Sequence, residues 1–332
     1  MIIISRTPVR ISFFGGGTDY PGFYLRNKGA VLGTSIDKYT HVSISTQSGF
    51  FDHKIRIAYS KTELVNSVDH IEHPSIRECL KFKGIDQNLD IHIFSDLPAR
   101  TGLGSSSSFT VGFLNSLYAF CGQKVSKQRL AEEACHIEQS MIKENVGSQD
   151  QFHSSLGGFN VIEFSNSGIQ SRPVIVSQEK LQDLNNHLMM FYTGLTRHAS
   201  DVVKEQIEKT HNKSNDEHLL KMVDMVYKAE EIIANSSREN MIPELSFLLH
   251  ESWEMKKQLS SKVSSSFIDQ AYSAARNAGA YAGKLCGAGS GGFLALFVPP
   301  ERQHKVKEAL KDLLEVKVRF ENTGASIIYM KE

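Results

Sequence analysis

Alternating apolar and polar residues in the first third of the chain predict β-strands. Residues 41–46 and 89–94 each place their apolar side chains on one face of an extended segment. The spacing changes in residues 109–120, where apolar side chains recur every three or four positions and predict a helix that ends before Gly122. This region therefore predicts a strand, a loop rich in glycine and serine, and a helix, in that order.

Helical periodicity dominates the rest of the chain, with short apolar segments between the helices. Ser126 is a suitable N-terminal cap for a second helix, whose apolar stripe runs to Met141, and residues 155–164 return to a glycine turn and a strand. The second half is predicted to be helices with a small sheet, an α+β arrangement. Its predicted helices are 199–235, 243–258, 266–278 and 301–314, and its predicted strands are 187–192, 293–298, 316–320 and 325–330.

The length of the chain, 332 residues, is enough for two packed domains that each have a core of their own. No internal repeat or linker of low complexity separates them. We place the boundary between residues 165 and 185, which gives predicted domains at residues 1–180 and 181–332.

The charge of the chain argues against nucleic acid as its main partner. Lysine plus arginine and aspartate plus glutamate number 37 each, so there is no large basic field. The apolar N-terminal run is too short for a signal or a membrane helix, and no later segment approaches a membrane span, so we expect no membrane. The four scattered cysteines suggest neither a disulfide framework nor a zinc site. We therefore expect a cytoplasmic protein.

The loop GLGSSSS, at residues 102–108, is the strongest candidate for binding phosphate. It lies between a predicted strand and a predicted helix, where unpaired backbone N–H groups and the helix dipole favour an anion. The glycines let the backbone approach a ligand, and the serines add hydroxyl groups. A flexible loop with a serine cap is the structural alternative. The chain contains no Walker A motif.

A second loop, GAGSGG at residues 287–292, satisfies the pattern G-x-G-x-x-G. A dinucleotide-binding motif follows a strand and opens a helix, whereas a predicted strand follows this loop, so we reject a dinucleotide site. A tight turn explains part of the pattern. Four glycines in six residues are more than a turn needs, which favours close approach of another loop or a ligand.

A third glycine-rich segment, RISFFGGGTDY, begins at Arg10 and ends at Tyr20. A cation, a hydroxyl (Thr18) and an acid (Asp19) accompany its glycines, a mixture that suits a polyol better than a phosphate. A turn capped by Asp19 is the structural alternative. Downstream, Glu138 on the second helix and Asp150 on the loop expected after it could supply the metal ligand and the base that a kinase needs.

In this order, the three segments resemble the three motifs of the GHMP kinase superfamily of small-molecule kinases. TPVRISFFGGGTDY is similar to the first motif, LPARTGLGSSSSF to the second, which binds ATP phosphates, and KLCGAGSGGFLALF to the third. Galactokinases carry Glu-His where this chain has Gly16 and Gly17. In that respect the chain looks like the D-glycero-D-manno-heptose 7-phosphate kinases, with fucokinase-type sugar kinases close behind. The resemblance covers nearly the whole chain.

The resemblance implies an α+β GHMP kinase fold. Its N-terminal domain is related to ribosomal protein S5 domain 2, its C-terminal domain is a ferredoxin-like α/β-plait, and ATP and sugar meet between them. Ser106, or its neighbour Ser105 or Ser107, is implied to bind Mg²⁺ together with Glu138. Asp150 is implied to act as the base or to orient the sugar hydroxyl, with Arg10 beside it. The residues implied to bind ATP are Gly102, Leu103, Gly104, Ser105, Ser106, Ser107, Ser108, Gly287, Ala288 and Gly289.

The resemblance also implies a sugar site beside the first motif. Arg197 is the first candidate for the cation that binds the substrate's own phosphate, with Lys38 and Arg26 behind it. Ser290 occupies a position in the third motif that is more often glycine, and we expect the small side chain to be tolerated. The residues implied to contact the sugar are Gly16, Gly17, Thr18, Asp19 and Gln149.

The implied activity is phosphorylation of the anomeric hydroxyl of a heptose 7-phosphate by ATP and Mg²⁺. The 1,7-bisphosphate formed would feed nucleotide-activated heptose for surface glycans. A fucokinase-like or other free-sugar 1-kinase is the alternative within the fold. A non-catalytic sensor of sugar or ATP is the alternative of another class, and the presence of Glu138, Asp150 and Arg10 argues against it. The expected partners are a sugar phosphate and ATP, with the protein a monomer or a homodimer.

Overall fold

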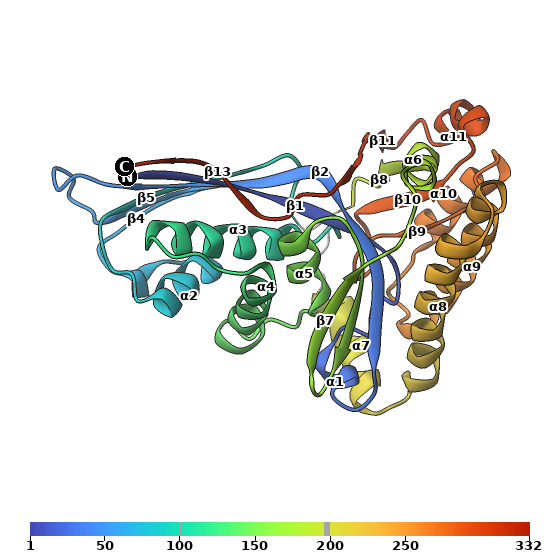
Figure 1. Cartoon of the computed structure of the whole chain (residues 1–332), viewed down its shortest axis with the longest axis horizontal. Coiled ribbons are helices and arrows are strands. Elements are labelled where there is room, and N and C mark those ends of the chain that lie inside the picture. Colours follow the sequence, from blue (N-terminus) through green and yellow to red (C-terminus); the bar gives the residue numbers. More distant parts are fainter. Residues whose placement is uncertain (100, 196–199) are drawn as a thin grey trace.

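The larger of the two sheets is long and strongly twisted and runs through much of the molecule (Figure 1). The computed structural model describes residues 1–99, 101–195 and 200–332. The strands of this sheet are β1 (Ile2–Phe14), β2 (Gly29–Thr46), β3 (Ile55–Ala58), β4 (Thr62–Val65), β5 (Leu89–Ser95), β6 (Phe159–Ser165), β7 (Gly168–Pro173), β12 (Phe320–Glu321) and β13 (Ser326–Lys331). Among the described residues, the main path runs β13-β1-β2-β5-β3-β4, and β6 and β12 also pair with β2.

Helices cover one face of this sheet in the first half of the chain (Figure 1). They are α2 (Pro74–Lys83), α3 (Ser105–Phe120), α4 (Lys127–His136) with its π-helical extension η2 (Ile137–Met141), and α5 (Gln149–Leu156). Two further short pieces are α1 (Pro21–Tyr24) and the 3₁₀ turn η1 (Val68–His70). Helix α4 begins as the sequence predicts, because the Ser126 side chain accepts a hydrogen bond from the N–H of Arg129.

A second, smaller sheet lies in the other half of the molecule. Its described strands are ordered β11-β8-β10-β9. They are β8 (Leu188–Tyr192), β9 (Ala282–Leu285), β10 (Phe293–Phe297) and β11 (Leu314–Glu315). The helices of this half are α6 (Gln178–His187), α7 (Ser200–His211), α8 (Asp216–Asn235), α9 (Arg238–Leu259), α10 (Ser266–Asn277) and α11 (Gln303–Ala309), with the 3₁₀ turn η3 (Pro300–Arg302) before α11.

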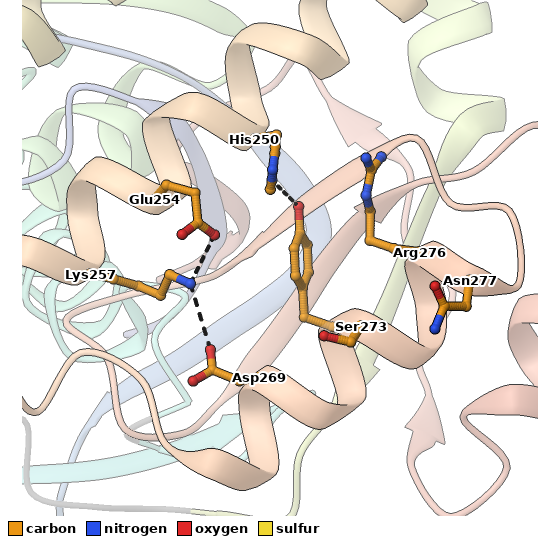
Figure 2. A pocket seen from close by; sticks show the side chains of 8 residues that line it. His250, Glu254, Lys257, Asp269, Ser273, Arg276 and Asn277 are labelled. Atoms are coloured by element: carbon orange, nitrogen blue, oxygen red, sulfur yellow. Dashed lines mark hydrogen bonds and ion pairs between the residues drawn. The ribbon is translucent and has the colours of Figure 1, made fainter.

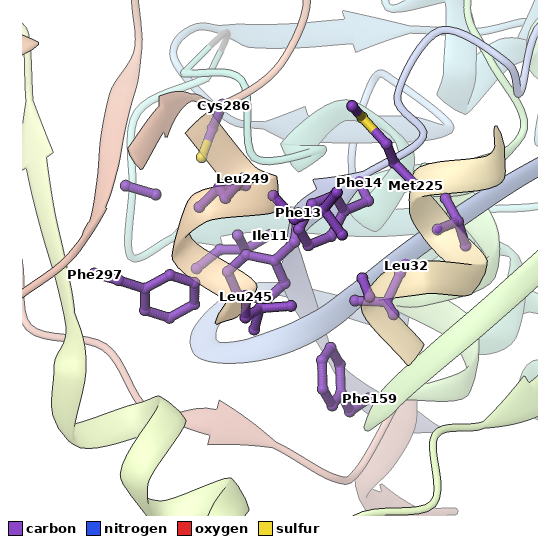
Figure 3. Packing of buried hydrophobic residues seen from close by; sticks show 14 of the residues in the cluster. Ile11, Phe13, Phe14, Leu32, Phe159, Met225, Leu245, Leu249, Cys286 and Phe297 are labelled. Atoms are coloured by element: carbon purple, nitrogen blue, oxygen red, sulfur yellow. The ribbon is translucent and has the colours of Figure 1, made fainter. Parts of the chain in front are cut away.

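The two halves share a continuous apolar core, which Figure 3 shows around Phe13. The ring of Phe13 stacks on Phe297 of β10, with centroids 5.6 Å apart, and meets the edge of Phe159 of β6. Strand β1 reflects this packing, because its outer end alternates between buried and partly exposed residues whereas residues 7–14 are all buried. The inner end of β1 therefore carries its side chains, including Arg10, into the interior between the halves.

The end of the chain returns to the first sheet, which corrects our placement of the strand at 325–330 in the small sheet. β13 pairs antiparallel with β1, from Ile2 opposite Lys331 to Arg6 opposite Ser326. The expected strand at 316–320 is also wrong over most of its length, since only Phe320 belongs to a strand, β12. Alternation of side chains identifies a strand but not the sheet that it joins. The domain limits at 1–180 and 181–332 stay predictions.

Among the described residues, no helix is both long enough and apolar enough to cross a membrane.

Candidate active site

The loop 102–108 joins the sheet to α3, as the sequence predicts, and its serines form the first turn of the helix. Gly104 precedes that turn with a left-handed φ of 75°. The first N–H groups of a helix have no partners within it, so this end of α3 can receive an anion. Ser106 is exposed to solvent, whereas Ser107 and Ser108 are buried. The loop thus offers both backbone donors and one solvent-facing hydroxyl.

The second glycine-rich loop, 287–292, packs directly on the first. A Cβ on Gly102 would collide with the carbonyl oxygen of Cys286, and a Cβ on Gly287 would collide with the Cα of Gly102. This confirms the expectation that the extra glycines allow close approach of another loop. Ser290 in the same loop has a left-handed φ of 64°, and its hydroxyl donates to the carbonyl of Lys262. That bond holds a serine in a conformation that glycine adopts more easily.

Arg10 and Asp150 form a nearly buried ion pair beside both loops. Arg10 donates from Nε to Oδ1 of Asp150 at 2.8 Å, and its Nη2 lies 2.7 Å from the same oxygen in an ion pair. Its Nη1 donates to the carbonyl of Gly102 at 2.7 Å. Asp150 lies in the first turn of helix α5, not on a loop as the sequence suggested. The helix was not predicted because it is short and begins with polar residues. The pair brings two predicted catalytic residues together next to Gly104.

Glu138 lies below the start of α3 and is almost fully buried. Its Oε2 accepts hydrogen bonds from Ser107 at 2.8 Å and from the amide of Gln151 at 2.5 Å, whereas its Oε1 is buried without a partner among the described residues. Burial raises the pKa of Glu138 to about 7, despite hydrogen bonds that favour the charged form. Ser107 contacts this carboxylate, whereas Ser106 faces solvent.

This donor set fits Mg²⁺. A carboxylate with one unpartnered oxygen next to a serine hydroxyl is typical of a site that takes its remaining ligands from phosphate and water. No group of three or more histidine, cysteine, aspartate or glutamate side chains that could hold a metal occurs among the described residues.

Asp19 is buried at the end of the first motif, near the ion pair. It accepts a hydrogen bond from the N–H of Gly17 at 2.9 Å, and a Cβ on Gly147 would collide with its Oδ2. Burial is the main cause of its raised pKa, and the nearby charge of Asp150 acts in the same direction. The amide of Gln149 lies against Gly16, and its Oε1 is buried without a described partner. Asp19, Gln149 and Gly16 therefore form a buried polar cluster lined by glycine next to Asp150.

The other residues predicted for the sugar differ in their surroundings. The hydroxyl of Thr18 contacts the backbone of Gly15 and Ala30, so it shapes the loop. Arg197 lies outside the described residues. Arg26 donates to Asp216 at 2.9 Å, and Lys38 lies 3.5 Å from Asp37.

Matches to protein-family models show which family the chain belongs to. The model "GHMP kinases N terminal domain" matches residues 68–158, and "GHMP kinases C terminal" matches residues 232–316. This chain belongs to the GHMP kinase family. The GHMP kinase fold implied by the sequence motifs is thereby confirmed.

Relatives of this GHMP kinase include sugar and sugar-phosphate kinases. A D-glycero-alpha-D-manno-heptose 7-phosphate kinase of Campylobacter jejuni is 28% identical, over 93% of each chain. An L-fucokinase/L-fucose-1-P guanylyltransferase of Bacteroides fragilis is 23% identical, over 94% of this chain and 36% of that protein. Among solved structures, a D-glycero-D-manno-heptose 1-phosphate kinase of Bacteroides thetaiotaomicron matches all of both chains with a TM-score of 0.79 at 22% identity.

Two buried lysines of this GHMP kinase are absent from the sequence-based site. Lys284 of β9 donates to the carbonyls of Ser12 at 2.7 Å and Phe13 at 3.0 Å, and burial lowers its pKa. Lys256 of α9 donates to the carbonyl of Gly287. Lys256 lies three residues after the buried Trp253 and therefore on the same face of α9. A lysine on the apolar stripe of a helix is the signal by which the sequence could have revealed this residue.

A cavity of about 290 Å³ lies elsewhere in this GHMP kinase, between α9 and α10 (Figure 2). Lys257 in its wall reaches Glu254 at 2.8 Å and Asp269 at 3.8 Å, so its charge is balanced within the wall. His250 and Tyr272 share a hydrogen bond of 2.9 Å across it. None of the described residues that were predicted for the active site lines this cavity.

Proposed function

We propose that this chain is an ATP-dependent sugar kinase that phosphorylates the anomeric hydroxyl of D-glycero-D-manno-heptose 7-phosphate. The observation that carries the proposal is the position of Asp150. Arg10 engages only its Oδ1, and Oδ2 lies beside Gly104, where a Cβ would be 3.0 Å away, at the start of α3. A free carboxylate oxygen next to a phosphate-binding loop can accept the proton of an acceptor hydroxyl.

The proposed reaction is a single displacement. The anomeric oxygen forms a bond to the γ-phosphorus of ATP while the bond from that phosphorus to the β–γ bridging oxygen breaks. The hydroxyl proton passes to Oδ2 of Asp150, and ADP leaves. Arg10 holds the carboxylate in place, and the N–H groups at the start of α3 stabilise negative charge on the phosphates.

Glu138 and Ser107 are the residues that would hold Mg²⁺. When bound, the metal would neutralise charge on the phosphates of ATP. Ser107 replaces Ser106 as our first candidate, since it is the serine that contacts Glu138. Asp19, Gln149 and Gly16 would bind the sugar hydroxyls, because they border Asp150 on the side of the first motif.

Sequence similarity supports the heptose assignment. The Campylobacter jejuni heptose 7-phosphate kinase aligns with almost the whole chain, at 28% identity. The product would be the 1,7-bisphosphate, an intermediate suited to making nucleotide-activated heptose. We also propose a cytoplasmic location, where ATP is available, and the four cysteines are free thiols as that compartment favours. The state as a monomer or a homodimer stays a prediction.

The test offers the purified protein ATP and Mg²⁺ with one acceptor at a time. The acceptors are heptose 7-phosphate, heptose 1-phosphate, fucose, galactose and mevalonate. We expect the highest kcat/KM for heptose 7-phosphate, with the new phosphate on the anomeric carbon in the phosphorus NMR spectrum. Fast turnover of a free sugar without turnover of the heptose would overturn the substrate assignment and retain the kinase. Binding of ADP without turnover of any acceptor would favour a sensor.

A further inference from the structure

Lys256 lies near the end of helix α9 with only 7% of its surface exposed. Its ammonium donates to the carbonyl oxygen of Gly287, and no carboxylate in the described part of the chain lies within ion-pairing distance of it. A buried cation without a paired anion costs free energy of folding. Such a group is retained where its charge serves a ligand or holds a neighbouring group in place.

Lys256 and Arg10 are buried cations that each donate a hydrogen bond to a backbone carbonyl of one glycine-rich loop. Arg10 donates to the carbonyl of Gly102 in the first loop, and Lys256 donates to the carbonyl of Gly287 in the second. Gly102 and Gly287 are themselves in contact. Each cation thus fixes the direction of one peptide group at the point where the loops meet.

The direction of the Gly287 carbonyl determines where the next N–H points. In a planar trans peptide, the N–H of Ala288 is directed opposite to the carbonyl of Gly287, and hence away from Lys256. Ala288 is partly exposed, and no described residue accepts a hydrogen bond from its N–H. The second loop therefore presents a free backbone donor on the side opposite the lysine.

We propose that Lys256 is a positioning residue, which holds the Gly287–Ala288 peptide so that the N–H of Ala288 donates to the phosphates of the nucleotide. The inference rests on the proposed function in one respect, that the chain binds ATP. Lys256 faces charged and titratable groups of several elements, namely Arg10, Asp19, Asp150, Lys284 and Cys286.

The experiment measures the Kd of ADP by calorimetry for the whole protein and three variants. We expect Lys256→Met to raise the Kd about tenfold or more, since a hydrogen bond to a charged group is lost. Lys256→Arg keeps the charge and is expected to restore part of the affinity. Lys257→Met is the matched control, one residue along the same helix, and is expected to leave the Kd unchanged because Lys257 pairs with Glu254.

The pH dependence of ADP binding separates positioning from a purely structural role. Burial lowers the pKa of Lys256 to about 8, so the ammonium and the affinity for ADP decline as the pH rises through 8. Lys256→Arg is expected to keep its affinity to higher pH. The same Kd and pH profile in folded Lys256→Met as in the natural protein would overturn the inference. If Lys256→Met fails to fold, a Lys256→Arg pH profile that matches the natural one overturns it equally.

These outcomes do not depend on the sugar. If the natural protein binds ADP but rejects heptose 7-phosphate, the substrate assignment fails and the role of Lys256 still stands. If the natural protein does not bind ADP, both the proposed kinase and this inference are overturned.

Discussion

Arg10 directs two of its nitrogens to the same oxygen of Asp150, at 2.8 Å and 2.7 Å, and leaves the other oxygen of that carboxylate without a hydrogen-bond partner in the described part of the chain. The pair joins the middle of a strand to the first turn of a helix, 140 residues apart in the chain. Rigid elements on both sides fix the free oxygen against the phosphate loop more firmly than a loop residue could.

Replacing Asp150 with asparagine is expected to lower kcat by about 10²–10⁴, because the amide cannot accept the acceptor's proton. The Kd of ADP is expected to change little, because asparagine has the same shape and the proposed role of Asp150 concerns the acceptor hydroxyl. Steady-state kinetics with calorimetry measures both. Asp86→Asn, at an exposed site, is the control. A folded Asp150→Asn variant with natural kcat would rule out the proposed proton acceptor.

Glu138 makes the stability of the metal-free protein depend on pH. Its pKa is about 7 in the folded chain against an ordinary 4.5, so its stabilising contribution is full below pH 4.5 and is lost as the pH rises through 7. The loss is on the order of a few kcal/mol, because each pKa unit corresponds to about 1.4 kcal/mol. Denaturant unfolding at pH 5 and pH 8 measures it.

Glu138→Gln provides the comparison, because glutamine has the same shape and does not titrate. As the pH rises above 7, the unfolding free energy of the natural protein is expected to fall relative to that of Glu138→Gln. A difference that is constant with pH would contradict the assigned burial of a carboxylic acid. His153, buried with a pKa near 3, is present in both proteins, so its own pH dependence cancels.

Gly102→Ala is expected to weaken ADP binding and lower stability by about 1–3 kcal/mol. The added Cβ meets the backbone of Cys286 at a left-handed φ of 80°, so the two loops must separate. Gly84→Ala is a matched control, because Gly84 has a φ of 63° with open space around its Cα. It suffers the strain without the collision. Equal losses of ADP affinity in both variants would show that contact between the loops is unimportant.

Ser290→Gly is expected to change the free energy of unfolding by less than about 1 kcal/mol. Glycine relieves the strain of a positive φ, and loss of the bond to the Lys262 carbonyl offsets that gain. Ser290→Val is expected to be far more destabilising, since a β-branched residue rarely adopts this conformation. Chemical denaturation compares the three proteins. A large loss of unfolding free energy in Ser290→Gly would mean that the hydrogen bond of the hydroxyl outweighs the backbone strain at this position.

Sequence patterns predicted the long helices and the longer strands β2, β5, β6, β8 and β10, because burial imposes a period of two or about 3.6 on the side chains. They did not predict short strands such as β3, β4, β7 and β9. They also predicted that another loop or a ligand approaches the backbone of the loops at 102–108 and 287–292 closely, because such contact leaves room only for glycine. The partner of β13 could not be predicted, because pairing between distant segments leaves no local signal. The motif resemblance supplied the predicted roles of Arg10 and Asp150, but only the folded arrangement shows that Arg10 engages Oδ1 and that Oδ2 lies beside Gly104.

The site residues that were missed are those whose chemistry comes from burial. Lys256 and Lys284 have the side chain of an ordinary surface lysine, and the fold alone removes them from water. Ser107 was named only as an alternative to Ser106, because the two are neighbours of identical type. The rotation between these two consecutive helical residues places Ser107 against Glu138 and Ser106 in solvent. A list of residue types cannot separate them, whereas the angle of 100° per residue can once the helix is placed.

The pairing of β13 with β1 has a consequence for synthesis on the ribosome. The edge of β1 that β13 covers becomes complete only when residues 326–331 have emerged, long after the first sheet could otherwise form. Until then, the nascent chain presents an unpaired strand edge, the kind of surface to which other strands add. Chaperones that shield strand edges during translation are therefore expected to raise the yield of this protein more than they raise its final stability.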